Sequence, residues 1–253
     1  MFPALTTAGK LGEGILAPND SSGYEGANDL PYAIDNIQVD FVHSEPGVPV
    51  GYWRAVGHSH NGFVTESFID ELAHQQQQDP LQFRRALLQQ HPRALGVLDK
   101  AASMANWGKP LPGCTQGVAV HKSFGTWVAQ IADVKTDGNR IQVQRMVCAV
   151  DCGLVVNPDT VKAQMEGGMI FGLTAALHGK ITLNKGAVQQ GNFHDYPLLR
   201  LAETPQLQVA IIASHEDPTG VGEPGVPPVA AAVANAVFAA TGKRLRELPL
   251  QLS

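Results

Sequence analysis

Residues 127–151 read WVAQIADVKTDGNRIQVQRMVCAVD, and this stretch carries the strongest signal for the fold. Two apolar runs rich in valine and isoleucine, 127–134 and 140–151, flank the turn residues Thr136-Asp137-Gly138-Asn139. Glycine and asparagine readily adopt the positive φ angles of tight hairpin turns, so this arrangement is a strong signal for two antiparallel strands. The sequence therefore predicts a long β-hairpin in the second half of the chain.

Helical patterns lie on both sides of this hairpin. Asp79 followed by Pro80 predicts a helix start, with aspartate as the N-cap, proline at the first helical position and Gln82 three residues after the cap. Apolar residues at helical spacing, the last run being ended by Gly242, predict four further helices. These expected helices cover 61–78, 94–106, 160–177 and 229–241.

Three other patterns predict strands. Alternating apolar and polar residues predict a strand over 37–44. A turn at 184–186 predicts a second hairpin, and an apolar run predicts a short buried strand over 207–212. The expected fold class is α+β, with a loop, strand and helical region at 1–110 and an α+β region at 111–253.

Composition narrows the class of protein. Of the 253 residues, 44% are hydrophobic and 16% are charged, which fits a globular protein with a sizeable interior. The net charge of −5 gives no reason to expect binding to nucleic acid or to an acidic membrane surface. The longest apolar run, 226–240, is too short and too rich in alanine and proline to span a bilayer.

The cysteines and the N-terminus carry less information. Cys114, Cys148 and Cys152 are odd in number and form no CxxC pair, which predicts buried free thiols rather than a disulfide framework or a zinc site. The first residues read as a loop without a signal-peptide pattern. A start inside a loop, with so little charge, suggests a fragment or a split-gene product that leaves apolar surface exposed. The sequence leaves the cytoplasm and the periplasm both open, because an export signal would lie on a preceding part.

The turn Gly220-Val221-Gly222-Glu223-Pro224 runs into an alanine- and valine-rich helix. The glycines let the backbone approach a ligand closely, and the helix start beyond Pro227 is expected to offer N–H groups to an anionic group. A glutamate held at such a place can act as a general base. For an isolated motif, a solvated surface turn would be the better interpretation.

A second segment, residues 51–60, holds Arg54 among aromatic residues and glycines. Arginine can bind a phosphate group through two parallel hydrogen bonds, and the helix that follows would help. His58 and His60 alternate as zinc ligands could, but two histidines without further ligands are weak evidence for a metal site.

Two more segments follow the hairpin. Residues 151–158 read as a strand end and a helix cap, for which a structural role is favoured. Gln164 precedes Gly167 and Gly168 inside a predicted helix, where each glycine costs about 1 kcal/mol relative to alanine. Close packing and close approach of a cofactor both explain these glycines, and Gln164 has donors and acceptors for the edge of a heterocycle.

Four stretches resemble one protein family when taken together and in order. They are GYWRAVGHSHNGFVTESFIDELA from residue 51, CAVDCGLVVNPDTVKAQMEGGMIFGL from residue 148, NFHDYPLLR from residue 192 and GVGEPGVPPVAAAVANAVFAATGKRLRELPL from residue 220. In combination they resemble the molybdenum-binding subunit of the xanthine oxidase family, and within it the isoquinoline 1-oxidoreductase β-subunit branch with bacterial membrane-linked aldehyde dehydrogenases. The resemblance implies the C-terminal part of the molybdenum cofactor-binding domain.

The resemblance also implies roles for single residues. Glu223 matches the family's base, which takes a proton from the hydroxyl group on molybdenum, with Gly222 beside it. Gln164 and Arg54 match residues that contact the pterin. Val56 stands in the substrate pocket where the family has a stacking phenylalanine, so an aromatic sandwich around the substrate is not expected.

The implied cofactor is a molybdenum molybdopterin, usually the cytosine dinucleotide form in bacteria. Two glycine-rich loops of the family cradle are absent, so the resemblance implies that the chain works with the N-terminal portion of the same large subunit. A small subunit would hold two [2Fe–2S] clusters, because three cysteines cannot hold them. A cytochrome c could accept the electrons, and the substrate would be an aldehyde or an N-heteroaromatic compound, with water as the oxygen source.

Two other interpretations stay open at this stage. In the first, the chain is a truncated, cofactor-free structural or assembly fragment without activity of its own. In the second, it is a zinc enzyme that uses His58 and His60. The three interpretations can be distinguished by measuring bound molybdenum, bound zinc and the CMP that acid releases from a cytosine dinucleotide cofactor.

Overall fold

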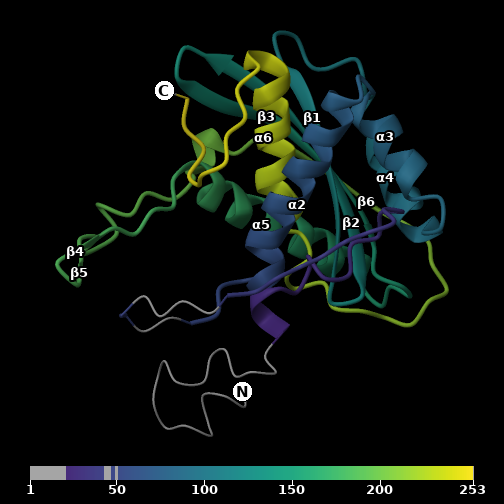
Figure 1. Ribbon diagram of the computed structural model, residues 1–253, viewed down its shortest axis with the longest axis horizontal. Helices are drawn as coiled ribbons and strands as arrows, with labels where there is room; N and C mark the ends of the chain where they lie inside the picture. Colours follow the sequence, from purple (N-terminus) through teal and green to yellow (C-terminus); the bar gives the residue numbers. More distant parts are fainter. Residues whose placement is uncertain (1–20, 43–46, 49–50, 253) are drawn as a thin grey trace, which may run out of the picture.

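The computed structural model describes residues 21–42, 47–48 and 51–252, and its centre is a four-stranded sheet (Figure 1). β1 (Thr115–Ser123), β2 (Thr126–Asp137) and β3 (Arg140–Asp151) form an antiparallel meander, and β6 (Gln206–Ile211) runs parallel to β3. The hairpin predicted around Gly138 is therefore confirmed. β1, which the patterns did not predict, extends it at one edge.

Both faces of the sheet are buried, because alternate side chains of a strand point to opposite sides. In β3, Met146 and Cys148 pack into one core, while Val147 and Ala149 pack into the other. The register of β2 against β3 shifts between Asp133 and Val134. A sheet buried on both faces needs helices on both sides, and the α+β class is confirmed.

The helices divide between these two faces (Figure 1). α5 (Pro158–Leu177) and α6 (Pro228–Thr241) cover one face, and α3 (Pro80–Leu87) and α4 (Pro92–Ala105) belong to the core on the other. α2 (Val56–Gln75) contributes to both cores, through Phe63 to one and Ile69 to the other. None of the helices in the described part of the chain is long and apolar enough to cross a membrane.

The five predicted helices are confirmed, with shifted ends. α2 begins five residues earlier than expected. Asp79 caps α3 as predicted, because its side chain accepts hydrogen bonds from the backbone N–H groups of Leu81 and Gln82. Asn157 caps α5 in the same way, which supports the structural interpretation of residues 151–158. α6 ends at Gly242, whose φ of 71° is left-handed.

The strand predicted over 37–44 is wrong for residues 37–42, and its last two residues lie outside the described residues. The alternating side chains Ile37, Val39 and Phe41 are 45%, 39% and 43% exposed. Alternation predicts an extended backbone, but a strand also needs a hydrogen-bonded partner, and no described residue supplies one here. Similarly, β6 is half-buried rather than buried, although its position was predicted.

The second predicted hairpin is confirmed as β4 (Leu183–Asn184) and β5 (Ala187–Val188), which lie in an arm that projects from the body (Figure 1). Large apolar side chains of this arm are exposed, among them Phe193 at 87% and Ile181 at 55%. Two 3-10 turns, Ser21–Gly23 and Leu201–Glu203, complete the described elements. The exposed apolar surface expected from the sequence is therefore present in this arm and in residues 34–42.

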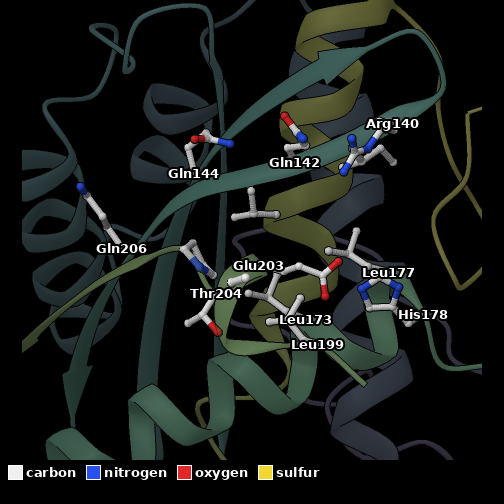
Figure 2. Close-up of a pocket in the computed structure, with 14 residues that line it drawn as sticks. Arg140, Gln142, Gln144, Leu173, Leu177, His178, Leu199, Glu203, Thr204 and Gln206 are labelled. Atoms are coloured by element: carbon white, nitrogen blue, oxygen red, sulfur yellow. The ribbon is translucent and has the colours of Figure 1, made fainter. Parts of the chain in front are cut away.

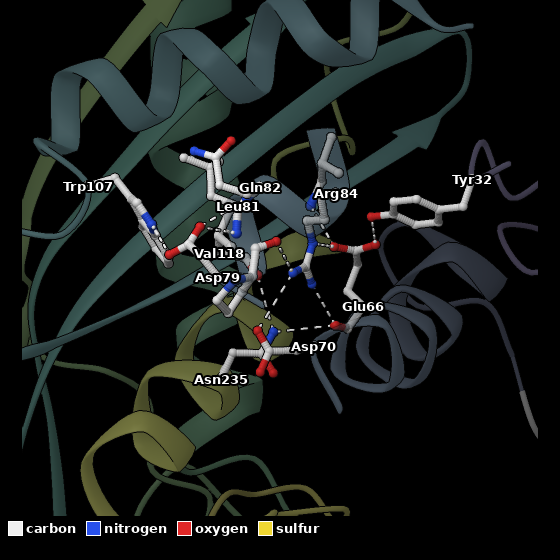
Figure 3. Close-up of polar contacts among 12 residues, drawn as sticks. Tyr32, Glu66, Asp70, Asp79, Leu81, Gln82, Arg84, Trp107, Val118 and Asn235 are labelled. Atoms are coloured by element: carbon white, nitrogen blue, oxygen red, sulfur yellow. Dashed lines mark hydrogen bonds and ion pairs between the residues drawn. The ribbon is translucent and has the colours of Figure 1, made fainter. Parts of the chain in front are cut away.

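A closed polar cluster lies inside the body, between α2, α3 and β1 (Figure 3). The Glu66 carboxylate accepts hydrogen bonds from Tyr32 Oη at 2.5 Å, from Arg84 Nε at 3.0 Å and from Val120 N at 2.9 Å. Arg84 also lies 3.6 Å from Asp70 and is fully buried. Burial by itself lowers the pKa of Arg84, but the nearby carboxylates outweigh it and raise that pKa above its usual value. This cluster fixes the middle of α2, the helix that begins beside Arg54.

Candidate functional site

Three predicted site residues meet at one place, although they come from three separate segments. Arg54 precedes α2, Gln164 lies on α5 and Glu223 lies in the turn before α6. Arg54 Nη2 donates to Gln164 Oε1 at 3.1 Å, and Arg54 Nε donates to the Gly222 carbonyl oxygen at 2.7 Å. Arg54 Nη2 also contacts the same carbonyl oxygen. These contacts place Arg54 and Gln164 beside the turn that carries Glu223.

The Glu223 carboxylate sits at the N-terminus of α2. Its Oε1 accepts a hydrogen bond from Ala55 N at 3.0 Å, and Ala55 is the N-cap of that helix. Unpaired N–H groups and the helix dipole stabilise negative charge at such an end. At the start of α6, Pro227 and Pro228 have no N–H group and Val229 N donates to Val226 O, so none of these three residues offers a free N–H group to an anion.

The backbone between Arg54 and α2 is strained. Ala55 has φ 74° and Val56 has φ 47°, which are left-handed values that residues other than glycine rarely adopt. Each such residue costs about 1–3 kcal/mol and persists only where its surroundings hold it. This conformation aims the Ala55 N–H at Glu223 and makes Val56 the first residue of α2. The substrate contact suggested for Val56 stays a prediction.

The glycines around the site fall into two groups. A Cβ on Gly168 would lie 3.0 Å from Gly225 Cα, and a Cβ on Gly172 would lie 2.8 Å from Val229, so these two serve close packing of α5 against the segment that carries Glu223. A Cβ on Gly167 or on Gly222 would meet nothing within 4 Å. Packing therefore does not explain Gly167 and Gly222, which are both exposed.

Aromatic rings adjoin the polar groups. Trp53 stacks on Phe171 with ring centroids 4.6 Å apart, and the Arg54 guanidinium carbon lies 5.5 Å from the centroid of the same Phe171 ring. Phe171 follows Gln164 by seven residues, which is two turns of helix and places both on one face of α5. Sequence reasoning missed Trp53 and Phe171, although this spacing could have indicated Phe171.

The turn that carries Glu223 is tied to the sheet. Thr126 Oγ1 at the start of β2 donates to the Gly220 carbonyl oxygen at 2.7 Å and lies 2.6 Å from Thr219 Oγ1. Gln130, fully buried in β2, donates to the Gly225 carbonyl oxygen at 2.8 Å. Both ends of the catalytic turn predicted from the sequence are therefore held by one strand.

The two histidines suggested as zinc ligands differ in their exposure to solvent. His58 is buried and its Nδ1 lies 3.0 Å from His121 Nε2, whereas His60 is exposed. Among the residues that the structure describes, no group of three or more histidine, cysteine, aspartate or glutamate side chains could hold a metal ion. The zinc interpretation therefore has no support in the described part of the chain.

The surroundings of the cysteines and of Asp151 indicate structural roles. Cys148 and Cys152 are buried as predicted, and burial raises the pKa of Cys148 to about 12. The prediction is wrong for Cys114, which is half-exposed because it lies in the loop just before β1. Asp151 accepts two hydrogen bonds of 2.8 Å from Arg93. Burial acts to raise the pKa of the Asp151 carboxyl group, but these bonds prevail and hold that pKa below its usual value.

Two cavities differ in their relation to this site. One of about 390 Å³ lies at the opposite end of β3, with Arg140, Gln142 and Glu203 on its walls (Figure 2), and no predicted site residue lines it. The other, of about 310 Å³, is lined by Trp53 and by Val226, three residues beyond Glu223. The second cavity therefore adjoins the candidate site, and the first does not.

Comparison with known sequences identifies relatives of this chain. Residues 100–205 match the molybdopterin cofactor-binding domain family. The chain is 35% identical to the isoquinoline 1-oxidoreductase β subunit of Brevundimonas diminuta, over 88% of this chain and 29% of the relative. It is also 35% identical to the membrane-bound aldehyde dehydrogenase of Gluconacetobacter polyoxogenes, over 79% of this chain and 29% of the relative. The chain thus spans less than a third of the length of these relatives.

Solved structures show the same fold. Quinoline 2-oxidoreductase from Pseudomonas putida 86 matches 79% of this chain and 52% of its own chain, with 12% identity and a TM-score of 0.69. The aldehyde oxidoreductase of Desulfovibrio desulfuricans matches 78% of this chain and 40% of its own, with 13% identity and a TM-score of 0.63. The motifs, the fold and the relatives agree, and the chain belongs to the xanthine oxidase family of molybdenum hydroxylases, as part of a molybdopterin-binding large subunit.

Proposed function

We propose that the chain is the C-terminal portion of the molybdopterin-binding subunit of a molybdenum hydroxylase, with Glu223 as the general base. The substrate would be an aldehyde or an N-heteroaromatic compound, and water would supply the oxygen. The observation that carries this proposal is the convergence of Arg54, Gln164 and Glu223 at one place, through hydrogen bonds of 2.7–3.1 Å around Gly222 and Ala55.

The residues present fit a pterin cofactor. Gln164 offers its amide NH₂ group and Arg54 its guanidinium to the heteroatoms of a heterocycle, while Gly167 and Gly222 leave open space beside them. Gly167 lies one turn from Gln164 on the same helix, so a flat group lying along α5 would meet a donor and no side chain. Glycine in a helix interior costs about 1 kcal/mol relative to alanine, and close approach of a ligand would explain why Gly167 is present despite this cost.

When bound, the molybdenum cofactor supplies the activated oxygen and accepts two electrons. The overall reaction converts a substrate C–H group and water into a C–OH group, two protons and two electrons. Glu223 would take one of these protons on its carboxylate, which the Ala55 N–H holds in place through Oε1. Such a positioned base is typically worth about 10²–10⁴-fold in rate. Arg54 would hold both Gln164 and the Gly222 backbone against the cofactor.

The partners follow from the same proposal. The chain would assemble with the N-terminal portion of the same large subunit, whose glycine-rich loops would complete the cradle. A small subunit would hold two [2Fe–2S] clusters, and a cytochrome c would accept the electrons. The exposed apolar side chains of residues 34–42 and of the arm around Phe193 offer surface for such assembly. We expect the isolated chain to be inactive.

The test is purification of the chain together with its proposed partners, followed by measurement of molybdenum and of CMP released by acid. The expected result is equal amounts of both, because the proposed cofactor is the cytosine dinucleotide form. Arg54→Ala should lower both, whereas Arg85→Ala, which breaks an exposed ion pair with Asp99, should leave both unchanged. An assembled complex without molybdenum would instead support the cofactor-free structural fragment.

A further inference from the structure

The strained start of α2 requires something to hold it. Ala55 and Val56 are consecutive left-handed residues, and valine is branched at Cβ, which makes this conformation rarer still. The Ala55 N–H that results is the group that binds Glu223. Such backbone persists only where neighbouring contacts determine it. Contacts of the first turn of α2 must therefore hold Ala55 and Val56 in place.

His58 makes buried contacts in this first turn. It follows Ala55 by three residues, on the same face of the helix, and helical side chains lean toward the N-terminus. His58 is 7% exposed, its Nδ1 lies 3.0 Å from His121 Nε2, and its ring meets the edge of Phe124 at a centroid distance of 5.0 Å. A Cβ on Gly26 would lie 2.6 Å from His58 Nδ1, so the ring has little room to move.

Burial favours an uncharged His58 ring, although most of the nearby charges act against it. Burial is the largest effect and lowers the pKa of His58, and nearby Lys122 lowers it further. Asp29 and Glu223 raise it, and the Glu25 carboxylate lies 4.0 Å from His58 Nε2. Burial and then His58 lower the pKa of His121 to about 3. In a neutral pair one ring donates the hydrogen bond and the other accepts it, which fixes both rings.

We propose that His58 is a positioning residue for Glu223: with His121 it fixes the first turn of α2, and thereby the Ala55 N–H that binds the Glu223 carboxylate. The chemical importance of this placement rests on the proposed function of Glu223. The placement itself does not, because every contact that carries it lies within the chain. A histidine that only filled space in the core would not protect the Ala55 amide from exchange.

The first experiment titrates the histidine ring signals by NMR in the full chain and in the Glu223→Gln variant. Because the Glu223 charge raises the pKa of His58, its removal should lower that pKa. Equal pKa values of His58 in the two proteins would overturn the proposal.

The second experiment measures amide hydrogen exchange. In His58→Ala, exchange of the Ala55 amide should become at least roughly tenfold faster, while buried Ile131 in β2 keeps its protection. His58→Gln, which can still hydrogen-bond His121, should restore most of the protection, and His60→Ala should change nothing. A folded His58→Ala chain with unchanged Ala55 exchange would overturn the proposal, and if this variant fails to fold, the Gln variant and the titration decide.

Neither measurement requires the cofactor. Together with the molybdenum content of the assembled complex, they therefore distinguish the positioning role of His58 from the proposed function. If His58 shifts and Ala55 loses protection while the assembled complex holds no molybdenum, the positioning role stands and the proposed function fails. If molybdenum is present but neither change occurs, the proposed function stands and the positioning role is overturned.

Discussion

Two clusters that each contain a glutamate and an arginine lie along α2, and they differ in burial. In its middle, Glu66 is 1% exposed and Arg84 is fully buried, and the Glu66 carboxylate is bonded by Tyr32, Arg84 and the Val120 N–H (Figure 3). At its start, Arg54 and Glu223 are only half-buried. There a helix end binds the Glu223 carboxylate, and the glycine positions 167 and 222 have open space beside them.

This contrast separates a structural ion cluster from a binding site. A buried charge must have its partners within the protein, because desolvation is otherwise too costly. A binding site instead keeps donors and space available for another molecule. By this criterion the Glu66 cluster stabilises the fold, and we propose that the Glu223 cluster serves function. Substitutions in each cluster test this distinction.

The largest effect is expected at Glu223. In the assembled, molybdenum-loaded complex, Glu223→Gln should lower kcat by about 10²–10⁴-fold or more while molybdenum content stays near normal. Glutamine keeps the shape and can accept the Ala55 hydrogen bond, but it cannot take the proton. Steady-state kinetics normalised to molybdenum provide the measurement, with Glu71→Gln as a control remote from the site. Near-normal kcat in a fully loaded variant would remove Glu223 from the mechanism.

At Glu66 we expect a loss of stability instead. Glu66→Gln leaves Arg84 buried without its main counter-charge, which should lower the free energy of unfolding by about 3–5 kcal/mol. Denaturant unfolding gives this value, and the exposed pair between Glu71 and Arg246 is the matched control, worth about 1 kcal/mol or less. A loss at Glu66 no larger than at Glu71 would show that burial does not distinguish the two clusters.

The next prediction concerns how the stability of the fold depends on pH through the buried His121 ring. Its folded pKa of about 3 lies below the usual 6.5, so the unfolded chain binds the extra proton between these values. The stability that the neutral ring contributes is therefore complete above about pH 6.5 and is lost as the pH falls toward 3, by at most about 1.4 kcal/mol per pH unit. His121→Asn should flatten the dependence of unfolding free energy on pH between 6.5 and 4. An unchanged slope would contradict the prediction.

The smallest effect separates the two kinds of glycine. Gly167→Ala should stabilise the fold by about 0.5–1 kcal/mol, because the Cβ meets nothing and alanine favours the helix. In the assembled complex it should nevertheless lower molybdenum content, because the methyl group enters the space proposed for the cofactor. Gly96 in α4, which also has open space, is the control: Gly96→Ala should give the same stabilisation without loss of molybdenum.

Local sequence signals predicted most elements, because their causes are local. The Asp79 cap, the Gly138 turn and the Gly242 helix end each depend on residues a few positions apart. The strand over 37–44 failed for the opposite reason, since a strand requires a partner and alternation does not supply one. β1 was missed although it is joined to β2 by the two-residue turn Phe124-Gly125, because phenylalanine at a positive φ of 51° replaces the asparagine or aspartate that usually marks such a turn.

Some residues of the candidate site were likewise predicted from the sequence, and others were not. Arg54, Gln164, Gly222 and Glu223 were found from motifs and from the family resemblance, and the structure places them together. Trp53, Phe171 and the His58–His121 pair were not assigned to the site, because each acts through a residue far away in the sequence. The helix end that binds the Glu223 carboxylate, the start of α2, was not predicted either.

Short segments of the chain were enough to indicate which residues carry the proposed chemistry and which helices and hairpins hold them, because turn preferences, caps and motifs are local properties. The folded chain was needed to show which helix end holds Glu223, which glycines serve packing and which leave open space, and which charges are closed into the core. These features depend on contacts between segments more than a hundred residues apart, and the free energy of such contacts arises only when the chain has folded.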